Sequence, residues 1–120
     1  MDYSKLSDQE INMAIAEIFH PDSVVIESKS RPPCACITGH LPSLWVDYCN
    51  NPADAWPIIA ESHIGIAPYP NEAYAWSSRH GMASDLSAED KNPLRAAMIV
   101  FLMMQESANV PANSTGSDLR

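Results

Sequence analysis

The stretch "NPLRAAMIVFLMMQES", Asn92 to Ser107, decides how the rest of this 120-residue chain can fold. Asn92 suits the N-cap of a helix, Pro93 suits its first position, and every residue from Ala96 to Met104 is apolar. A helix that is apolar on all sides must be covered on all sides. We therefore expect this last helix to be buried both within the subunit and at a self-association interface, which makes the protein a homo-oligomer.

The N-terminal part of the chain carries a clear helix signal. The sequence "SDQE" is a capping box, in which Ser7 and Glu10 exchange hydrogen bonds with each other's backbone amides. Apolar residues then recur at helical spacing, with Asn12 off that stripe. Pro21 disfavours helical geometry at the residue before it. The sequence predicts a helix over Asp8–Phe19.

A further helix begins after a second Asn-Pro pair, in "DYCNNPADAWPII". Asn51 is the expected N-cap, Pro52 the first helical residue, and Asp54 places negative charge at the positive helix end. Pro57 removes the hydrogen bond to the Ala53 carbonyl, at a cost on the order of 3 kcal/mol. We therefore expect a kink at Pro57 or a first turn that is separate from the rest of the helix.

The remaining elements are strands and loops, which gives an α+β fold. The segments "SVVIES", "CACIT", "LWV", "HIGIAPY" and "EAYAWSS" predict strands, and "RHGMASDLSAEDK" predicts a loop. We expect residues 1–108 to form a single domain, in which a small antiparallel sheet packs against three helices. Residues 109–120 are small and polar, and predict a disordered C-terminal tail.

Charge and hydropathy restrict the partners. The net charge of −8 and the scattered basic residues oppose binding to DNA or RNA. The chain has neither a signal-peptide pattern at its start nor an apolar run near the roughly 18 residues of a membrane span. We expect no membrane association and a cytoplasmic location.

Metal binding and catalysis have little support in the sequence. Cys34, Cys36 and His40 form a CxCxxxH pattern, to which Cys49 could add a fourth ligand, but the spacing of a zinc site is incomplete. We expect instead that these cysteines are free thiols, small residues that fill a loop. The histidines stand near no catalytic motif. We predict no metal, no cofactor and no enzymatic activity.

Aromatic residues and helix N-termini indicate a binding site instead. Aromatic rings with a polar group can stack on a base, and helix N-termini bind anions. Arg95 could bind phosphate, and its alternative role is an ion pair with Asp90 or Glu89. We also expect Pro57 to turn the asparagines before its helix toward a cavity lined by a tryptophan. The predicted ligand-binding residues are Trp45, Tyr48, Asn50, Asn51, Trp76, Asn92 and Arg95. The alternative for the tryptophans is a place in the core.

Three blocks of the chain resemble the NinX family of small proteins from lambdoid bacteriophages: "MDYSKLSDQEINMAIAE", "DYCNNPADAWPII" and "NPLRAAMIVFLMMQE". A looser likeness, of pattern only, is to phage alpha-beta-alpha sandwich domains. The NinX resemblance implies a phage accessory protein in the cytoplasm of the host bacterium. Because the biochemical function of that family is unknown, the resemblance implies no site residues.

Two functional hypotheses follow for a small acidic phage protein without a catalytic motif. The first is a non-catalytic sponge that sequesters a small anionic nucleotide-type ligand, such as a second messenger of bacterial immunity. The second is an acidic protein-binding inhibitor, or a nucleic-acid mimic, that acts on a host defence or nucleic-acid enzyme. The dispersed carboxylates favour the first hypothesis.

Overall fold

The computed structural model describes residues 2–39, 43–78 and 86–109, which form three α-helices, a short 3-10 helix and two three-stranded antiparallel sheets. The helices are η1 (Tyr3–Lys5), α1 (Asp8–Phe19), α2 (Pro52–Glu61) and α3 (Pro93–Asn109). The strands are β1 (Val25–Glu27), β2 (Ala35–Ile37), β3 (Leu44–Val46), β4 (Ile64–Pro68), β5 (Ala73–Ser77) and β6 (Ser87–Asp90). The α+β class with three helices is confirmed, although the strands form two sheets rather than one.

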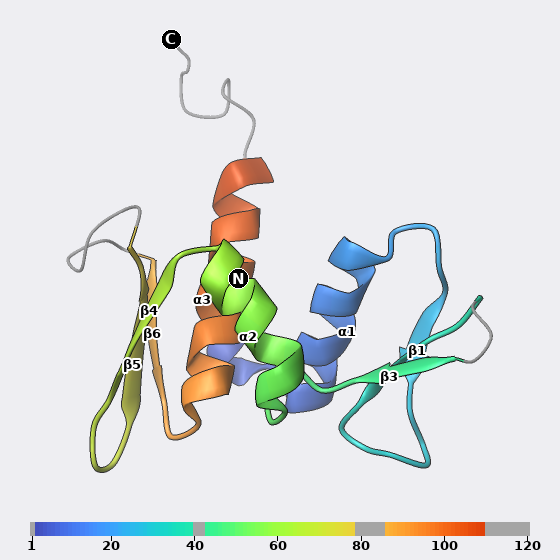
Figure 1. The fold of residues 1–120 in the computed structure, drawn as a ribbon, viewed down its shortest axis with the longest axis horizontal. Coiled ribbons are helices and arrows are strands. Elements are labelled where there is room, and N and C mark those ends of the chain that lie inside the picture. The colour runs from blue at the N-terminus through green and yellow to red at the C-terminus, as the bar shows by residue number, and fades with distance from the viewer. Residues whose placement is uncertain (1, 40–42, 79–85, 110–120) are drawn as a thin grey trace, which may run out of the picture.

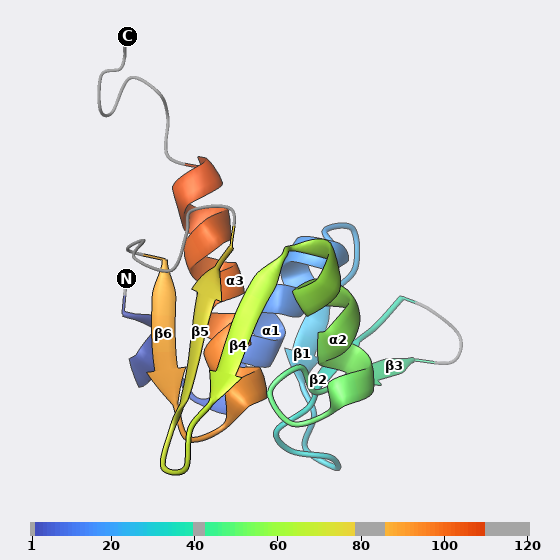
Figure 2. The same ribbon diagram turned by 60° about the vertical axis from the view of Figure 1, so that its left-hand side comes forward.

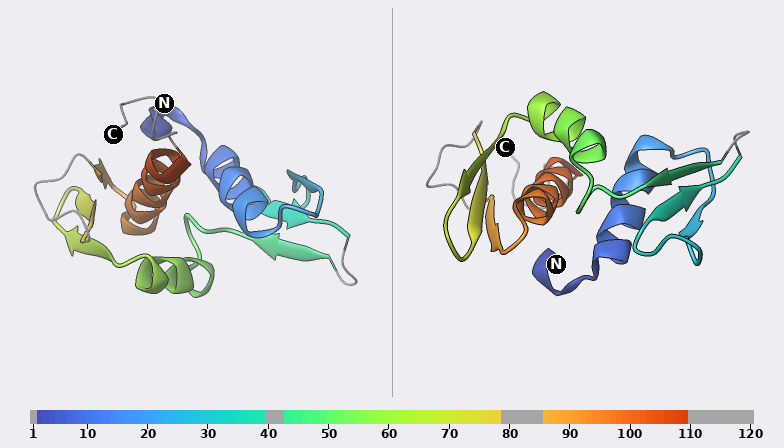
Figure 3. Two further views of the ribbon diagram at one scale, coloured as in Figure 1. Left: turned by 90° about the horizontal axis from the view of Figure 1, so that it is seen from above. Right: turned by 60° about the horizontal axis from the view of Figure 1, so that its bottom comes forward.

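The helices lie between the two sheets. Sheet A, with the strand order β1-β2-β3, and sheet B, with the order β4-β5-β6, stand at opposite sides of Figure 1. Figure 2 shows α3 behind the strands of sheet B, and Figure 3 shows α1 between α3 and sheet A. The layers therefore run sheet, helices, sheet, which is not the order of an alpha-beta-alpha sandwich.

Helix α3 is the centre of the core. All residues from Ala96 to Leu102 are buried, and Met103 and Met104 are partly buried against the same core. Sheet B, α2, α1 and η1 all contact this helix. The chain thus covers its most apolar segment by itself, which removes the reason for expecting a second subunit there. Self-association through α3 stays a prediction.

The local signals for α1 and α2 are confirmed, with one correction. The capping box of Ser7 and Glu10 is present, and Asn51 caps α2. The prediction of a separate first turn in α2 is wrong, because α2 is one unbroken helix through Pro57. Ala53 and Pro57 are both exposed, so water can satisfy the carbonyl of Ala53 that loses its helical donor.

The predicted strands are confirmed, and one further strand appears. Strand β6, Ser87–Asp90, falls in the stretch predicted as a loop, and that part of the prediction is wrong. It pairs with β5 in the register Tyr74↔Glu89. Asn109 ends α3, whereas residues 79–85 of the predicted loop and 110–120 of the predicted tail lie outside the described residues. Among the described helices, none is long and apolar enough to cross a membrane.

Candidate functional site

Arg95 is bound on all sides by its own chain. Its Nη1 donates to Asp8 Oδ1 at 2.7 Å, and its Nε donates to Asp90 Oδ1 at 3.2 Å. Its Nη2 donates to the carbonyls of Ser4 and Leu6 at 3.0 and 2.6 Å. Burial alone would lower the pKa of Arg95, but the hydrogen bonds and charges of the two aspartates raise it. The expected ion pair with Asp90 is confirmed, and a phosphate would have to displace these partners.

Asn92 and Asn50 lie beside Arg95, and their side chains also hydrogen-bond to groups of their own chain. Asn92 Oδ1 caps α3 by accepting from the amide of Leu94 at 2.9 Å. Asn92 Nδ2 donates to the Cys49 carbonyl at 2.6 Å and to Asn50 Oδ1 at 3.0 Å. Asn50 Nδ2 in turn donates to Asp8 Oδ2 at 3.2 Å. We call the set formed by Asp8, Asp47, Asn50, Asp90, Asn92 and Arg95 the polar junction.

Asn12 hydrogen-bonds to Asp47 of the polar junction, and it was not among the predicted site residues. It is fully buried, although it lies off the apolar stripe of the helix. Its Oδ1 accepts from the amides of Tyr48 and Cys49 at 2.8 and 3.3 Å. Its Nδ2 donates to the Pro33 carbonyl at 3.0 Å and to Asp47 Oδ1 at 2.9 Å. The only signal for its burial was that it is a polar residue next to Ile11, in a helix that contacts both sheet A and α3.

Tyr48 and Asn51 have structural places as well. Tyr48 is part of the buried core, and burial, followed by the charge of Asp54, raises its pKa to about 12. Asn51 is exposed, and its Oδ1 accepts from the amide of Ala53 at 3.0 Å. Among the described residues, the cavity that Trp45 lines has neither Tyr48 nor Asn51 in its lining.

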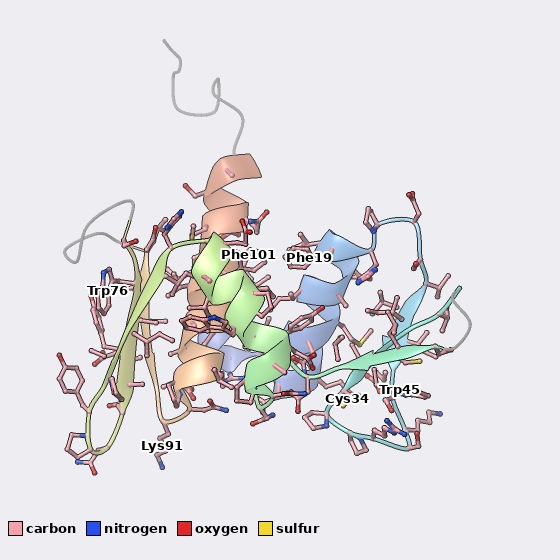
Figure 4. All side chains as sticks on the ribbon, in the orientation of Figure 1. Phe19, Cys34, Trp45, Trp76, Lys91 and Phe101 are labelled. Atoms are coloured by element: carbon pink, nitrogen blue, oxygen red, sulfur yellow. The ribbon has the colours of Figure 1, made fainter. Side chains whose placement is uncertain are left out.

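The two predicted tryptophans of the site lie at opposite ends of the molecule (Figure 4). Trp76 stacks on Tyr74 with ring centroids 5.6 Å apart and lies opposite Gly65 on β4. A Cβ atom at Gly65 would overlap the Trp76 ring. Trp45 is on β3 of sheet A. The seven predicted residues therefore do not converge on one site, and Asn50, Asn92 and Arg95 alone come together.

Trp45 belongs to a different surface, the outer face of sheet A. The register Ile26↔Cys36↔Trp45 places these three side chains in a row on the face opposite to α1, since Val25, Ala35 and Ile37 on the other face are buried in the core. The turn between β1 and β2 folds over this row. Together they form a hollow of about 380 Å³, which we call the sheet A hollow. Its lining residues are Ile26, Glu27, Ser28, Lys29, Ser30, Cys36 and Trp45.

Residues 2–105 of the chain match the family model described as Bacteriophage P22, NinX. The chain belongs to the NinX family. No curated protein matches it. The matched range contains both the polar junction and the sheet A hollow, so both surfaces are parts of the NinX fold rather than additions to it.

The sheet A hollow of this NinX chain carries positive charge at its edge. The guanidinium carbon of Arg31 lies 4.4 Å from the centroid of the Trp45 ring, and Lys29 lines the hollow. Among the described residues, no carboxylate lies within ion-pair distance of either cation. Glu27 also lines the hollow, so the local balance is one positive charge in a chain of −8.

Burial affects two of the three thiols near these surfaces. Cys34, Cys36 and Cys49 are free, as predicted. Burial raises the pKa of Cys34 and Cys49, so both thiols stay protonated near neutral pH. In the part of the chain that the structure describes, no three His, Cys, Asp or Glu side chains are placed to hold a metal ion. The hollow thus offers binding groups: an indole, apolar side chains and two cations.

Proposed function

We propose that this NinX-family protein is a non-catalytic binding protein that takes a small anionic ligand with a planar group in the sheet A hollow. A nucleotide-type ligand fits this description, because its base can stack on an aromatic ring and its phosphate can pair with Lys or Arg. In a host cell infected by a phage, such binding would sequester the ligand from its receptor.

The observation that carries the proposal is the position of Arg31 and Lys29 beside Trp45. The Trp45 side chain is 39% exposed, so part of the ring remains open to a ligand although Arg31 lies against it. A guanidinium that lies over an aromatic ring can still donate from its remaining N–H groups to a phosphate. The volume of about 380 Å³ lies in the range of small-ligand sites.

The helix N-termini support this function less than the sequence suggested. Asn92 and Arg95 already have protein partners within the polar junction, and replacing those partners by a ligand would leave Asp8 and Asp90 without their cation. In the part of the chain that the structure describes, no carboxylate lies within ion-pair distance of Lys29 or Arg31 at the sheet A hollow. The sequestering function is therefore assigned to Trp45 and its neighbours and not to the helix ends.

The test is to mix the purified protein with a pool of mononucleotides, cyclic dinucleotides and NAD-derived compounds, remove unbound compounds by filtration, denature the protein and identify what it releases by mass spectrometry. We expect intact release of one compound class. Arg31→Gln and Trp45→Leu should each weaken binding about tenfold or more in calorimetry. The matched controls are Lys91→Gln and Trp56→Leu, which change an exposed cation and an exposed tryptophan away from the hollow.

Three outcomes would contradict the proposal. If the protein retains no compound, it is not a sponge for these ligands. If it retains one but the two control variants weaken binding as much as Arg31→Gln does, the hollow is not the site. If a compound disappears and a product appears, the protein is an enzyme.

A further inference from the structure

A second surface of this protein has a different chemistry from the sheet A hollow and lies among the helices. The ends of α1 and α2 and the middle of α3 enclose a groove of about 370 Å³, which we call the helical groove. Its lining residues are Ile18, Phe19, Pro57, Ile58, Glu61, Ser62, Phe101 and Gln105. This surface does not depend on the function proposed above.

The helical groove has an apolar floor and apolar walls that remain partly exposed. Phe101 and Ile58 form buried parts of it, whereas Ile18 and Phe19 are 39% and 49% exposed. Phe19 stacks on Phe101 with ring centroids 5.6 Å apart, and Figure 4 labels both residues between α1 and α3. Single exposed apolar residues are ordinary, but contiguous apolar surface around a groove indicates a binding surface.

The charges at the helical groove decide what can cover it. Among the described residues that line the groove, Glu61 is the only ionisable one. No cation of the described residues lies within ion-pair distance of Glu61. A second copy of the chain would bring another net charge of −8 toward an acidic edge. A partner with Lys or Arg beside its apolar residues would instead complement both parts of the surface.

We propose that the helical groove docks a basic amphipathic helix of a partner protein. Helix-in-groove recognition places apolar side chains, spaced by one helical turn, into such a groove and leaves polar flanks at its edges. Phe19, Ile18 and Phe101 contact the apolar anchors, and Glu61 pairs with a Lys or Arg of the partner helix. The walls suit a helical occupant, because side chains of neighbouring helices interdigitate as ridges and grooves.

The experiment uses the full chain and three labelled helical peptides. The first has a Leu and a Phe one turn apart with lysines on both flanks, the second has the same anchors with glutamates, and the third has the lysines with the anchors changed to serine. Fluorescence anisotropy measures binding. We expect the first peptide to bind about tenfold or more tightly than the other two.

Variants of the protein locate the binding. Phe19→Ser should weaken binding of the lysine peptide about tenfold. Glu61→Lys should reduce the preference for the lysine peptide over the glutamate peptide by about threefold or more. Trp56→Ser, an exposed change on the same helix as Glu61 but outside the groove, should leave binding unchanged. Thermal melting checks that each variant folds. If Phe19→Ser does not fold, Glu61→Lys still tests the proposal, because Glu61 is exposed.

The proposal is overturned if none of the peptides binds, or if the lysine and glutamate peptides bind equally to the native chain. It is also overturned if analytical ultracentrifugation shows a dimer that Phe19→Ser converts to monomer, because a second copy would then occupy the groove. Binding that survives both Phe19→Ser and Glu61→Lys would place the peptide elsewhere.

Discussion

Replacing Asn12 by alanine should strongly destabilise the protein. The substitution leaves the amides of Tyr48 and Cys49 and the Pro33 carbonyl without their hydrogen-bond partner. Each unpaired buried group costs about 1–3 kcal/mol. The total is less than three full penalties, because the two amides share the single Oδ1 of Asn12. The expected loss is about 3–5 kcal/mol, a large part of the 5–15 kcal/mol that typically stabilises a domain.

Urea unfolding followed by circular dichroism measures this loss. The matched control is Gln9→Ala, because Gln9 also lies on α1 and donates to two loop carbonyls, of Ser28 and Cys34, but at 3.4 and 3.2 Å and with partial exposure. We expect that control to lose about 1 kcal/mol or less. Hydrogen exchange should also accelerate at the amides of Tyr48 and Cys49 in the Asn12 variant alone.

A further variant separates hydrogen bonding from packing volume. Asn12→Leu fills the space of the side chain but makes none of its hydrogen bonds, so it should be as unstable as Asn12→Ala. The reasoning is refuted if the leucine variant regains the stability of the native chain, since the buried volume would then be what matters. It is equally refuted if Asn12→Ala loses no more than Gln9→Ala.

Three further predictions concern single sites. Gly65→Ala should lower stability by about 1–3 kcal/mol in thermal melting, because its Cβ would overlap the Trp76 ring. The free energy of unfolding should fall as the pH rises from 10 to 12 and fall less in Tyr48→Phe, since the pKa of Tyr48 is raised from 10.0 to about 12 and the unfolded tyrosine ionises first. Cys34, which is half-buried, should react with a thiol reagent well before the fully buried Cys49 in the native protein, as mass spectrometry of labelled peptides can show.

The parts of the fold that the sequence predicted are those whose signals are local. The capping box at Ser7 and the prolines at the starts of α2 and α3 act on the residues next to them, so these helices begin where expected. Strand β6 was missed because "SAED" has neither β-branched residues nor an alternating pattern. Its structure comes from pairing with β5, which is not visible in four residues.

The candidate site shows the same division between local signals and contacts that form only in the folded chain. Trp45 was selected as an aromatic residue with a polar group, but Lys29 and Arg31 were not selected with it. They stand 14 to 16 positions earlier in the chain and reach Trp45 because the turn after β1 folds over the outer face of sheet A. Asn12 was missed for a related reason, since its partners come from two loops that only the folded chain brings together.

The polar junction explains why residues that resemble an anion site in the sequence belong to the architecture instead. Sheet A packs on α1 and sheet B packs on α3, so the chain must hold two helices with separate sheets in one arrangement. Arg95 does this at the start of α3 by bonding to Asp8 at the start of α1. A helix N-terminus attracts a carboxylate of the same chain as readily as it attracts a phosphate. Lys29 and Arg31 have no carboxylate within ion-pair distance among the described residues, so they are the better indicators of an external anion in a chain this acidic.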